Sequence, residues 1–312
     1  MDFSLSTSYF AGQHLAPEAI AEKTLALGFT GVELGYFTRE TEIDAWCKII
    51  ERTPLDIKSI HAFCPMPVGM PQLGPEVFSL ADPDDTARQQ AIAAIFRALN
   101  AAQAVEAYAI VCHGGRIDLR QSGLLFGSKP YRSQLSQAFR MRGGHPDFTL
   151  VQKERDMRAE TAPRWVDNLS RSLDIVLPHF EDAQIVLAFE NLPGLEAFPD
   201  PSELAFLKQR FPTPALGAWY DIGHGERKQR VGDWPVEDTL AFTAPFTAGV
   251  HIHDVVDLEE DHSAPGEGGV DFEHLRPLLE QEPLIRVFEP NPNLSEVRLQ
   301  AGLAYMQAFF NP

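Results

Sequence analysis

The sequence predicts a single (β/α)₈ barrel, an α/β fold in which eight parallel strands alternate with eight helices. Three observations lead to this prediction. Short apolar segments typical of strands alternate with amphipathic segments typical of helices, which indicates a parallel sheet. About eight such units follow one another, and the chain of 312 residues is long enough for one barrel. The alternative is an open, doubly wound sheet; no second domain is visible, so residues 1–312 are predicted to form one barrel domain.

The first half of the chain contains four of the predicted units. A helix is expected at 17–28, where Pro17 suits the first turn and Gly28 suits the C-terminal cap. Further helices are expected around 41–51 and at 84–104. The strand-like segments are FSLSTSYF (3–10), FTGVELGYF (29–37), DIKSIHAF (56–63) and AYAIVCHGG (107–115).

Residues 119–153 interrupt this alternation of strands and helices and are predicted to be a long insertion loop after the fourth strand. A loop of this length in a compact chain is typical of a functional segment or an insertion. It is expected to cover the mouth of a pocket or to mediate contacts in a homo-oligomer. Helices are then expected near 156–178, 201–210, 236–243, 272–281 and 295–309. The strands between them are AQIVLAFENLPG (183–194), ALGAWYDIGHG (215–225), TAGVHIHD (247–254) and LIRVFEP (284–290).

The composition excludes several classes of partner. The chain has 26 basic and 44 acidic side chains, a formal charge of −18, which argues against nonspecific nucleic-acid binding and against an anionic membrane surface. Its three cysteines lie far apart and predict no disulfide framework, so we expect a cytoplasmic protein. Neither a signal peptide nor an apolar run of about 18 residues is visible. A small-molecule ligand is therefore the expected partner.

Six consecutive predicted strands finish on side chains that can bind a metal. In a parallel barrel the carboxyl ends of the strands share one rim, where active sites lie. A charged group at the end of an apolar strand is costly unless it is paired or coordinated. Carboxylates and imidazoles together suit divalent Zn, Mn, Co, Fe or Mg, and the sequence leaves the identity open. The six residues are His61, His113, Glu190, Asp221, His253 and Glu289.

Seven short motifs in this order resemble the xylose isomerase-like TIM-barrel superfamily, which contains sugar isomerases, ketose 3-epimerases, inosose dehydratases and AP endonucleases. They extend over nearly the whole chain and are specific for the superfamily, but not for a substrate. The motifs are IHAF (60–63), VCHGG (111–115), AFENLPG (188–194), YDIGHG (220–225), HIHD (251–254), HSAPGEGGVDF (262–272) and FEP (288–290).

The resemblance implies a metal site at the rim. One ion would bind Glu190, Asp221, His253 and Glu289, because the second histidine of the strand-seven pair is the ligand in the family. The first, His251, lies deeper on the same face of the strand. It is expected to be either a hydrogen-bonded core histidine or a group that supports the site or the substrate.

The number of ions stays open. His262, with Glu260 two residues before it, resembles the AP endonucleases, which bind a third metal there, whereas similar sugar epimerases carry an arginine that touches the substrate. His61, His113 and His224 also match extra ligand positions of the three-metal enzymes. These side chains are therefore candidates for further metal ligands or for substrate binding.

The leading hypothesis is a metal-dependent isomerase or epimerase for a sugar or polyol. Glu190 and Glu289 would remove and return a proton at a carbon next to a carbonyl. Glu33 and Trp219 are candidates for substrate contacts, with structural roles as the alternative. The rival hypotheses are a hydrolase with a cluster of two or three zinc ions and a barrel that binds a ligand without turnover. Whether the substrate is phosphorylated is open; Arg116, Arg155 and Arg158 are the candidate cations for a phosphate.

Overall fold

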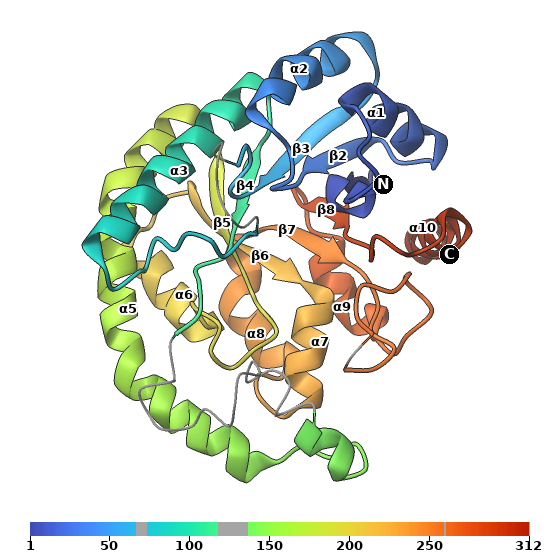
Figure 1. Ribbon diagram of the computed structural model, residues 1–312. Coiled ribbons are helices and arrows are strands. Elements are labelled where there is room, and N and C mark those ends of the chain that lie inside the picture. The colour runs from blue at the N-terminus through green and yellow to red at the C-terminus, as the bar shows by residue number, and fades with distance from the viewer. Residues whose placement is uncertain (67–73, 118–136, 259, 312) are drawn as a thin grey trace.

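The computed structural model describes residues 1–66, 74–117, 137–258 and 260–311 and contains a closed barrel of eight parallel strands in sequence order (Figure 1). Parallel pairing of β1 with β8, at Ser4 with Val287 and Leu5 with Phe288, closes the barrel. The predicted (β/α)₈ fold is confirmed. The strands are β1 (Ser4–Ser6), β2 (Gly31–Leu34), β3 (Asp56–His61), β4 (Ala109–Cys112), β5 (Val186–Glu190), β6 (Leu216–Asp221), β7 (Thr247–Ile252) and β8 (Ile285–Phe288).

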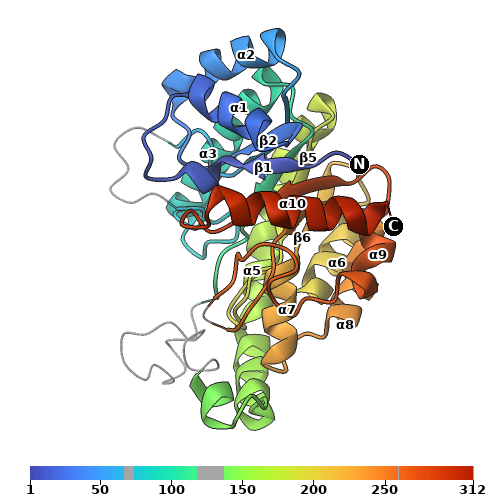
Figure 2. The same ribbon diagram turned by 90° about the vertical axis from the view of Figure 1, so that its right-hand side faces the viewer.

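Helices surround the barrel and cover its outer face (Figure 1). Within the described part of the chain, none of them is long and apolar enough to cross a membrane. Figures 1 and 2 show that the first half of α5 extends well beyond the barrel wall. The helices are α1 (Pro17–Ala26), α2 (Ile43–Arg52), α3 (Asp85–Ala104), α5 (Phe148–Ala183), α6 (Pro201–Arg210), α7 (Ile222–Arg230), α8 (Val236–Thr243), α9 (Phe272–Leu279) and α10 (Glu296–Phe310).

The strands are shorter than the predicted segments, and in two of these segments a helix begins where the strand ends. The first strand ends early, because Thr7–Phe10 forms a 3₁₀ helix whose start is capped by the side chain of Ser6. The segment 215–225 is a strand only as far as Asp221, where α7 begins. The carboxylate of Asp221 accepts a hydrogen bond of 2.6 Å from the backbone N–H of His224, which caps the first turn of α7.

The predicted insertion loop is shorter at its C-terminal end than expected. Helix α5 begins at Phe148, where the carboxylate of Asp147 accepts the backbone N–H of Leu150 at 3.1 Å. Residues 148–153 are therefore helical and not part of a loop. Most of the predicted insertion, 119–136, lies outside the described residues, so its expected contact with a pocket or an oligomer partner stays a prediction.

A small layer of apolar side chains fills the barrel interior beneath the rim. Trp219 lies in this layer with only 1% of its surface exposed, packed with Ala109, Val111, Ala188 and Val287. The neighbouring strand leaves room for the indole because residue 249 is a glycine. This packed layer closes the barrel from below, so that ligands can reach the strand ends only from the rim.

We predict that Gly249→Ala destabilises the protein by about 1–3 kcal/mol, the usual effect of overpacking a core. An added Cβ would lie 2.3 Å from the indole ring of Trp219, which the closed barrel holds in place. Urea unfolding followed by circular dichroism measures the change. Gly74→Ala is the matched control, because its Cβ would meet nothing nearer than 3.9 Å. Equal stability of the two variants would contradict this account.

Candidate metal centre

The barrel brings the predicted strand-end residues together at one rim. His61, Glu190 and Asp221 are the last residues of β3, β5 and β6. The other three follow the ends of β4, β7 and β8 by one residue. Among the described residues, their side chains and those of nearby histidines form three groups, in each of which the ligand atoms lie within 4.8 Å of one another. The groups are His61, His113 and Glu190; Glu190, Asp221, His251 and Glu289; and Asp221, His224 and His262.

The second of these, the central group, contains three carboxylates and one imidazole. The Nδ1 atom of His251 lies 3.2 Å from Glu289 Oε2 and 3.6 Å from both Glu190 Oε1 and Asp221 Oδ2. Its Nε2 atom faces Glu33 Oε1 at 3.2 Å. Because the Glu33 carboxylate accepts the Nε2–H, Nδ1 is the nitrogen that faces the three other carboxylates and would bind a metal.

His251 occupies the place that the sequence analysis gave to His253. The Nδ1 atom of His253 accepts the backbone N–H of His262 at 3.0 Å, so it carries no proton. Its Nε2–H then donates to Asp221 Oδ1 at 3.0 Å, and both nitrogens are engaged. Burial lowers the pKa of His253, which favours this neutral form. The geometry therefore favours His251 as the ligand and His253 as a hydrogen-bond donor to Asp221.

The two flanking groups each share one carboxylate with the central group. Glu190 Oε2 lies 3.2 Å from His61 Nε2 and 3.1 Å from His113 Nε2. On the other side, His224 Nδ1 lies 3.5 Å from Asp221 Oδ1. The three groups are thus continuous, with Glu190 and Asp221 as the shared members.

Each histidine of the flanking groups has its Nδ1 atom close to a fixed acceptor. An Nδ1–H donated to a carbonyl or carboxylate oxygen leaves Nε2 as a lone pair, the form in which imidazole binds a metal. The acceptors are the Ala62 carbonyl for His61 (3.0 Å), Glu76 Oε1 for His113 (3.3 Å) and Asp261 Oδ1 for His262 (3.3 Å). In His224 the Nδ1 atom lies near the Asn191 carbonyl (3.0 Å) and also faces the carboxylates of Glu190 (3.2 Å) and Asp221 (3.5 Å).

The central group has the properties of a cation site. In the described part of the chain, the buried atoms Glu190 Oε1 and His251 Nδ1 have no hydrogen-bond partner, although they lie 3.6 Å apart. Burial alone would raise the pKa of Glu190, but the charges of His113 and His251 hold it well below its usual range. Three ionised carboxylates this close repel one another unless positive charge lies between them. A divalent ion supplies that charge, and the oxygen and nitrogen donors suit it.

The loop that carries His262 is organised by Asp254, the last residue of the HIHD motif. Its buried carboxylate accepts four backbone N–H groups at 2.8–3.0 Å, those of Val255, Gly266, Gly268 and Val270. A Cβ at position 268 would lie 2.4 Å from Asp254 Oδ1, which explains the glycine there. The sequence analysis missed this role, although an acid followed by several glycines is a signal for such a turn.

Three residues expected at the ligands or the substrate lie elsewhere. Glu33 is fully buried behind His251 and accepts the Ser59 hydroxyl at 2.8 Å, so a substrate cannot reach it. Trp219 lies beneath His251 in the apolar layer, with ring centres 5.2 Å apart. The side chain of Glu260 is exposed and belongs to none of the three groups, whereas its neighbour Asp261 contacts His262.

The arginines considered for phosphate binding are paired with carboxylates. Arg116 contacts Glu76 and Glu196, at 2.8 Å and 2.6 Å. Arg155 pairs with Asp233 at 3.3 Å. The buried Arg158 binds Asp200 and Glu203 between α5 and α6. All three side chains are thus engaged within the protein.

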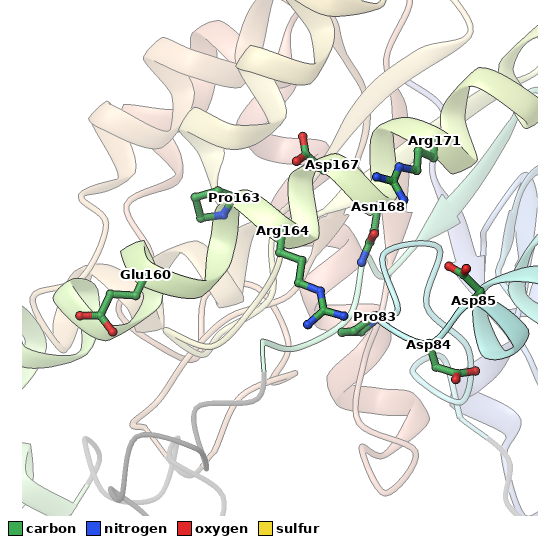
Figure 3. A pocket seen from close by; sticks show the side chains of 9 residues that line it. All are labelled: Pro83, Asp84, Asp85, Glu160, Pro163, Arg164, Asp167, Asn168 and Arg171. Carbon is green, nitrogen blue, oxygen red and sulfur yellow. The ribbon is translucent and has the colours of Figure 1, made fainter.

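A separate groove of about 720 Å³ lies between the start of α3 and the middle of α5 (Figure 3). Figure 3 shows Arg164 of α5 extending toward Pro83, with Asp84 and Asp85 nearby. None of the residues in the three groups lines this groove. It is therefore distinct from the rim.

Residues 21–308 match the family described as xylose isomerase-like TIM barrel. The chain belongs to this family, as its motifs and its barrel both indicate. The sequence has no match among curated proteins.

Solved structures with the same fold are similar to this chain over almost its whole length. A 3-keto-D-glucoside 4-epimerase from E. coli has a TM-score of 0.67 and 16% identity, and 99% of each chain is covered. The IolI protein with a bound zinc atom has a TM-score of 0.64 and 12% identity, over 99% of this chain and 97% of that one. An AP endonuclease of family 2 from Brucella melitensis has a TM-score of 0.61 and 16% identity, over 99% and 98%. At these identities the similarity shows the fold.

We predict that Asp254→Ala loosens the loop 254–270 and costs on the order of 3 kcal/mol, because four backbone N–H groups lose a buried, charged acceptor. Denaturant unfolding measures the cost, and limited proteolysis should cut the variant first within this loop. Asp257→Ala in the same loop is the control, since its carboxylate is exposed and accepts the N–H of Glu260 at 2.9 Å. An unchanged proteolytic pattern in Asp254→Ala would show that other contacts hold the loop.

Proposed function

We propose that this protein is a metal-dependent isomerase or epimerase that acts on a sugar or polyol. The observation that carries the proposal is the central group, in which Glu190, Asp221, His251 and Glu289 converge at the open end of the barrel. The names of the similar structures, which include a keto-glucoside epimerase, support a carbohydrate-type substrate. The family and fold alone do not select a reaction.

The four residues of the central group would hold the ion. When bound, a divalent ion would supply Lewis acidity to neighbouring substrate oxygens and so acidify the adjacent C–H bond. His251 is held for this task by Glu33, whose own carboxylate is fixed by the Ser59 hydroxyl. Such a carboxylate behind a histidine fixes its tautomer and raises its basicity as a ligand.

Glu289 is the better candidate for the proton-transfer group. Glu190 is surrounded by four imidazoles, with Oε2 near His61 and His113 and Oε1 near His224 and His251. Both of its oxygens face imidazole nitrogens, which suits a metal ligand shared between neighbouring groups. We therefore assign proton transfer to Glu289 and a ligand role to Glu190.

The surroundings of Glu289 agree with a base that is open to a substrate. Its side chain is 16% exposed, whereas that of Glu190 is 1% exposed. Burial would raise its pKa, but the charge of His251 and the contact with His262 lower it to about 2. The group is therefore ionised at neutral pH and ready to accept a proton. One such carboxylate can move a proton between neighbouring carbons, whereas inversion at one carbon needs a second group on the opposite face.

The two strand-seven histidines provide a direct test of the metal site. We expect His251→Ala to lose most of the bound metal, because it removes the only imidazole of the central group. His253→Ala should keep that ion, since it removes a hydrogen bond to Asp221 and not a ligand. Elemental analysis of both proteins, purified without chelator, measures the difference. Retention of metal by His251→Ala together with its loss from His253→Ala would restore the assignment made from the sequence.

The reaction can be tested by hydrogen exchange at carbon. Proton transfer through Glu289 should introduce deuterium from D₂O into one carbon of the true substrate, as seen by NMR or mass spectrometry. A panel of ketoses, keto-inositols and sugar acids should be incubated with the metal-loaded protein. Glu289→Gln should reduce labelling at least about a hundredfold, the usual contribution of a general base. Turnover of sugars without any label would point to a hydride shift and would remove Glu289 from proton transfer.

The overlap of the three groups favours a second candidate, a hydrolase of small phosphoesters with several divalent ions. Glu190 and Asp221 are placed to be shared between neighbouring ions, an arrangement known from two-metal hydrolysis. The charge of −18 argues against a nucleic-acid substrate. Release of phosphate or an alcohol from an ester, with no labelling of any sugar, would establish this candidate and exclude the isomerase.

A further inference from the structure

Helix α7 contributes two side chains to the flanking group that contains His262. His224 lies in its first turn and belongs to the group directly. Arg227 follows three residues later, which places it on a neighbouring face of the helix. It is 4% exposed, and its guanidinium pairs with Asp261 Oδ2. The other oxygen, Asp261 Oδ1, lies 3.3 Å from His262 Nδ1.

The backbone of His262 needs such support. Its φ of +59° lies in the left-handed region, which is unfavourable for residues other than glycine. The backbone N–H of His262 donates to His253 Nδ1 at 3.0 Å, and its carbonyl accepts the N–H of Asn291 at 2.8 Å. These bonds fix the main chain. The direction of the imidazole depends in addition on what its Nδ1 atom contacts.

We propose that Arg227 is a positioning residue, which acts through Asp261 to orient His262 toward Asp221 and His224 as a metal ligand. By pairing with one carboxylate oxygen, Arg227 fixes the direction of the Asp261 carboxylate in a mostly buried place. The second oxygen then accepts the Nδ1–H of His262, and the Nε2 lone pair points into the group. The inference rests on the proposed metal centre and adds how its loop-borne ligand, His262, is held.

The stacking of His262 on His253 agrees with this arrangement. The ring centres lie 4.0 Å apart and the planes differ by 9°. Burial would lower the pKa of His262, but its contacts with Asp261 and Glu289 raise it to about 10. Asp261 thus contacts the imidazole at its Nδ1 edge, while His253 packs against its face, and together they restrict its direction.

Arg230 provides a matched control on the same helix. It binds the same loop through the carbonyls of Val255 and Val256, at 3.0 Å and 3.2 Å, and pairs with Glu226 at 2.7 Å. These contacts involve neither Asp261 nor His262. Loss of Arg230 thus weakens the anchoring of the loop to α7 and leaves the partner of His262 in place.

The test is a zinc titration of the full-length protein and its variants, with stoichiometry from elemental analysis and affinity from competition with a chelator. Wild type should bind more than one equivalent, and His262→Ala should lose one of them. Arg227→Met and Asp261→Asn should weaken that same equivalent by about 10–100-fold, the usual effect of losing a group behind a metal ligand. Arg227→Lys should restore part of the affinity. Arg230→Met should keep it, even if its melting temperature falls.

The outcomes separate the inference from the proposed function. If wild type binds the extra equivalent and Arg227→Met and Asp261→Asn bind it equally well, the positioning role is wrong and the metal centre stands. A stoichiometry of one that His262→Ala leaves unchanged also overturns the inference, because His262 is then no ligand. Failure of the central site is seen separately, as retention of metal by His251→Ala. A loss of zinc in Arg230→Met as large as in Arg227→Met would assign the effect to general loosening of the loop.

Discussion

The arrangement of the rim depends on the electrostatic repulsion among three carboxylates. Glu190, Asp221 and Glu289 end or follow three strands of the barrel and point to one place, two of them almost fully buried. Such a group is unfavourable unless positive charge compensates it. Imidazoles surround it on every side, and most of them have one nitrogen close to a fixed acceptor. The protein thus directs imidazole nitrogen atoms toward the carboxylates. A bound divalent ion needs its ligand atoms oriented toward one point in this way.

The rest of the fold keeps these groups in place. The layer around Trp219 closes the barrel from below and supports His251 directly. Above the rim, Asp254 folds the loop that carries His262. The apolar layer and the Asp254 carboxylate are both buried. They act through packing or through hydrogen bonds to the backbone, so both are rigid. The polar rim therefore lies between a rigid apolar floor and an ordered loop, and a ligand has access only from the open side.

The sequence predicted the barrel and the convergence of the strand ends, because both follow from the alternation of strands and helices. It could not distinguish His251 from His253. The two residues lie on the same face of β7, and their depth depends on register. A register shift near Ala218 and Trp219 pairs Asp221 with His251, and no periodic pattern in the sequence reports such a shift. Similarly, a loop has no repeating pattern that predicts whether Glu260 or Asp261 faces the site. Only the fold shows that Asp261 contacts His262.

Sharing of Glu190 and Asp221 also means that the three groups cannot fill independently. The central group has three carboxylates, whereas each flanking group has one carboxylate and two imidazoles. A first divalent ion therefore gains most in the central group. Once it is there, the shared carboxylates have less negative charge for a second ion, and the ions repel each other. The flanking groups should consequently bind metal more weakly, and their occupancy should depend on the metal concentration.

When the flanking groups are empty, the imidazoles of His61, His113 and His224 remain available to hold substrate oxygens, as an isomerase requires. When they are filled, the same residues form the multinuclear centre that suits hydrolysis. The two proposed functions would thus correspond to two loading states of one set of ligands, and the relative affinities of the three groups would decide between them.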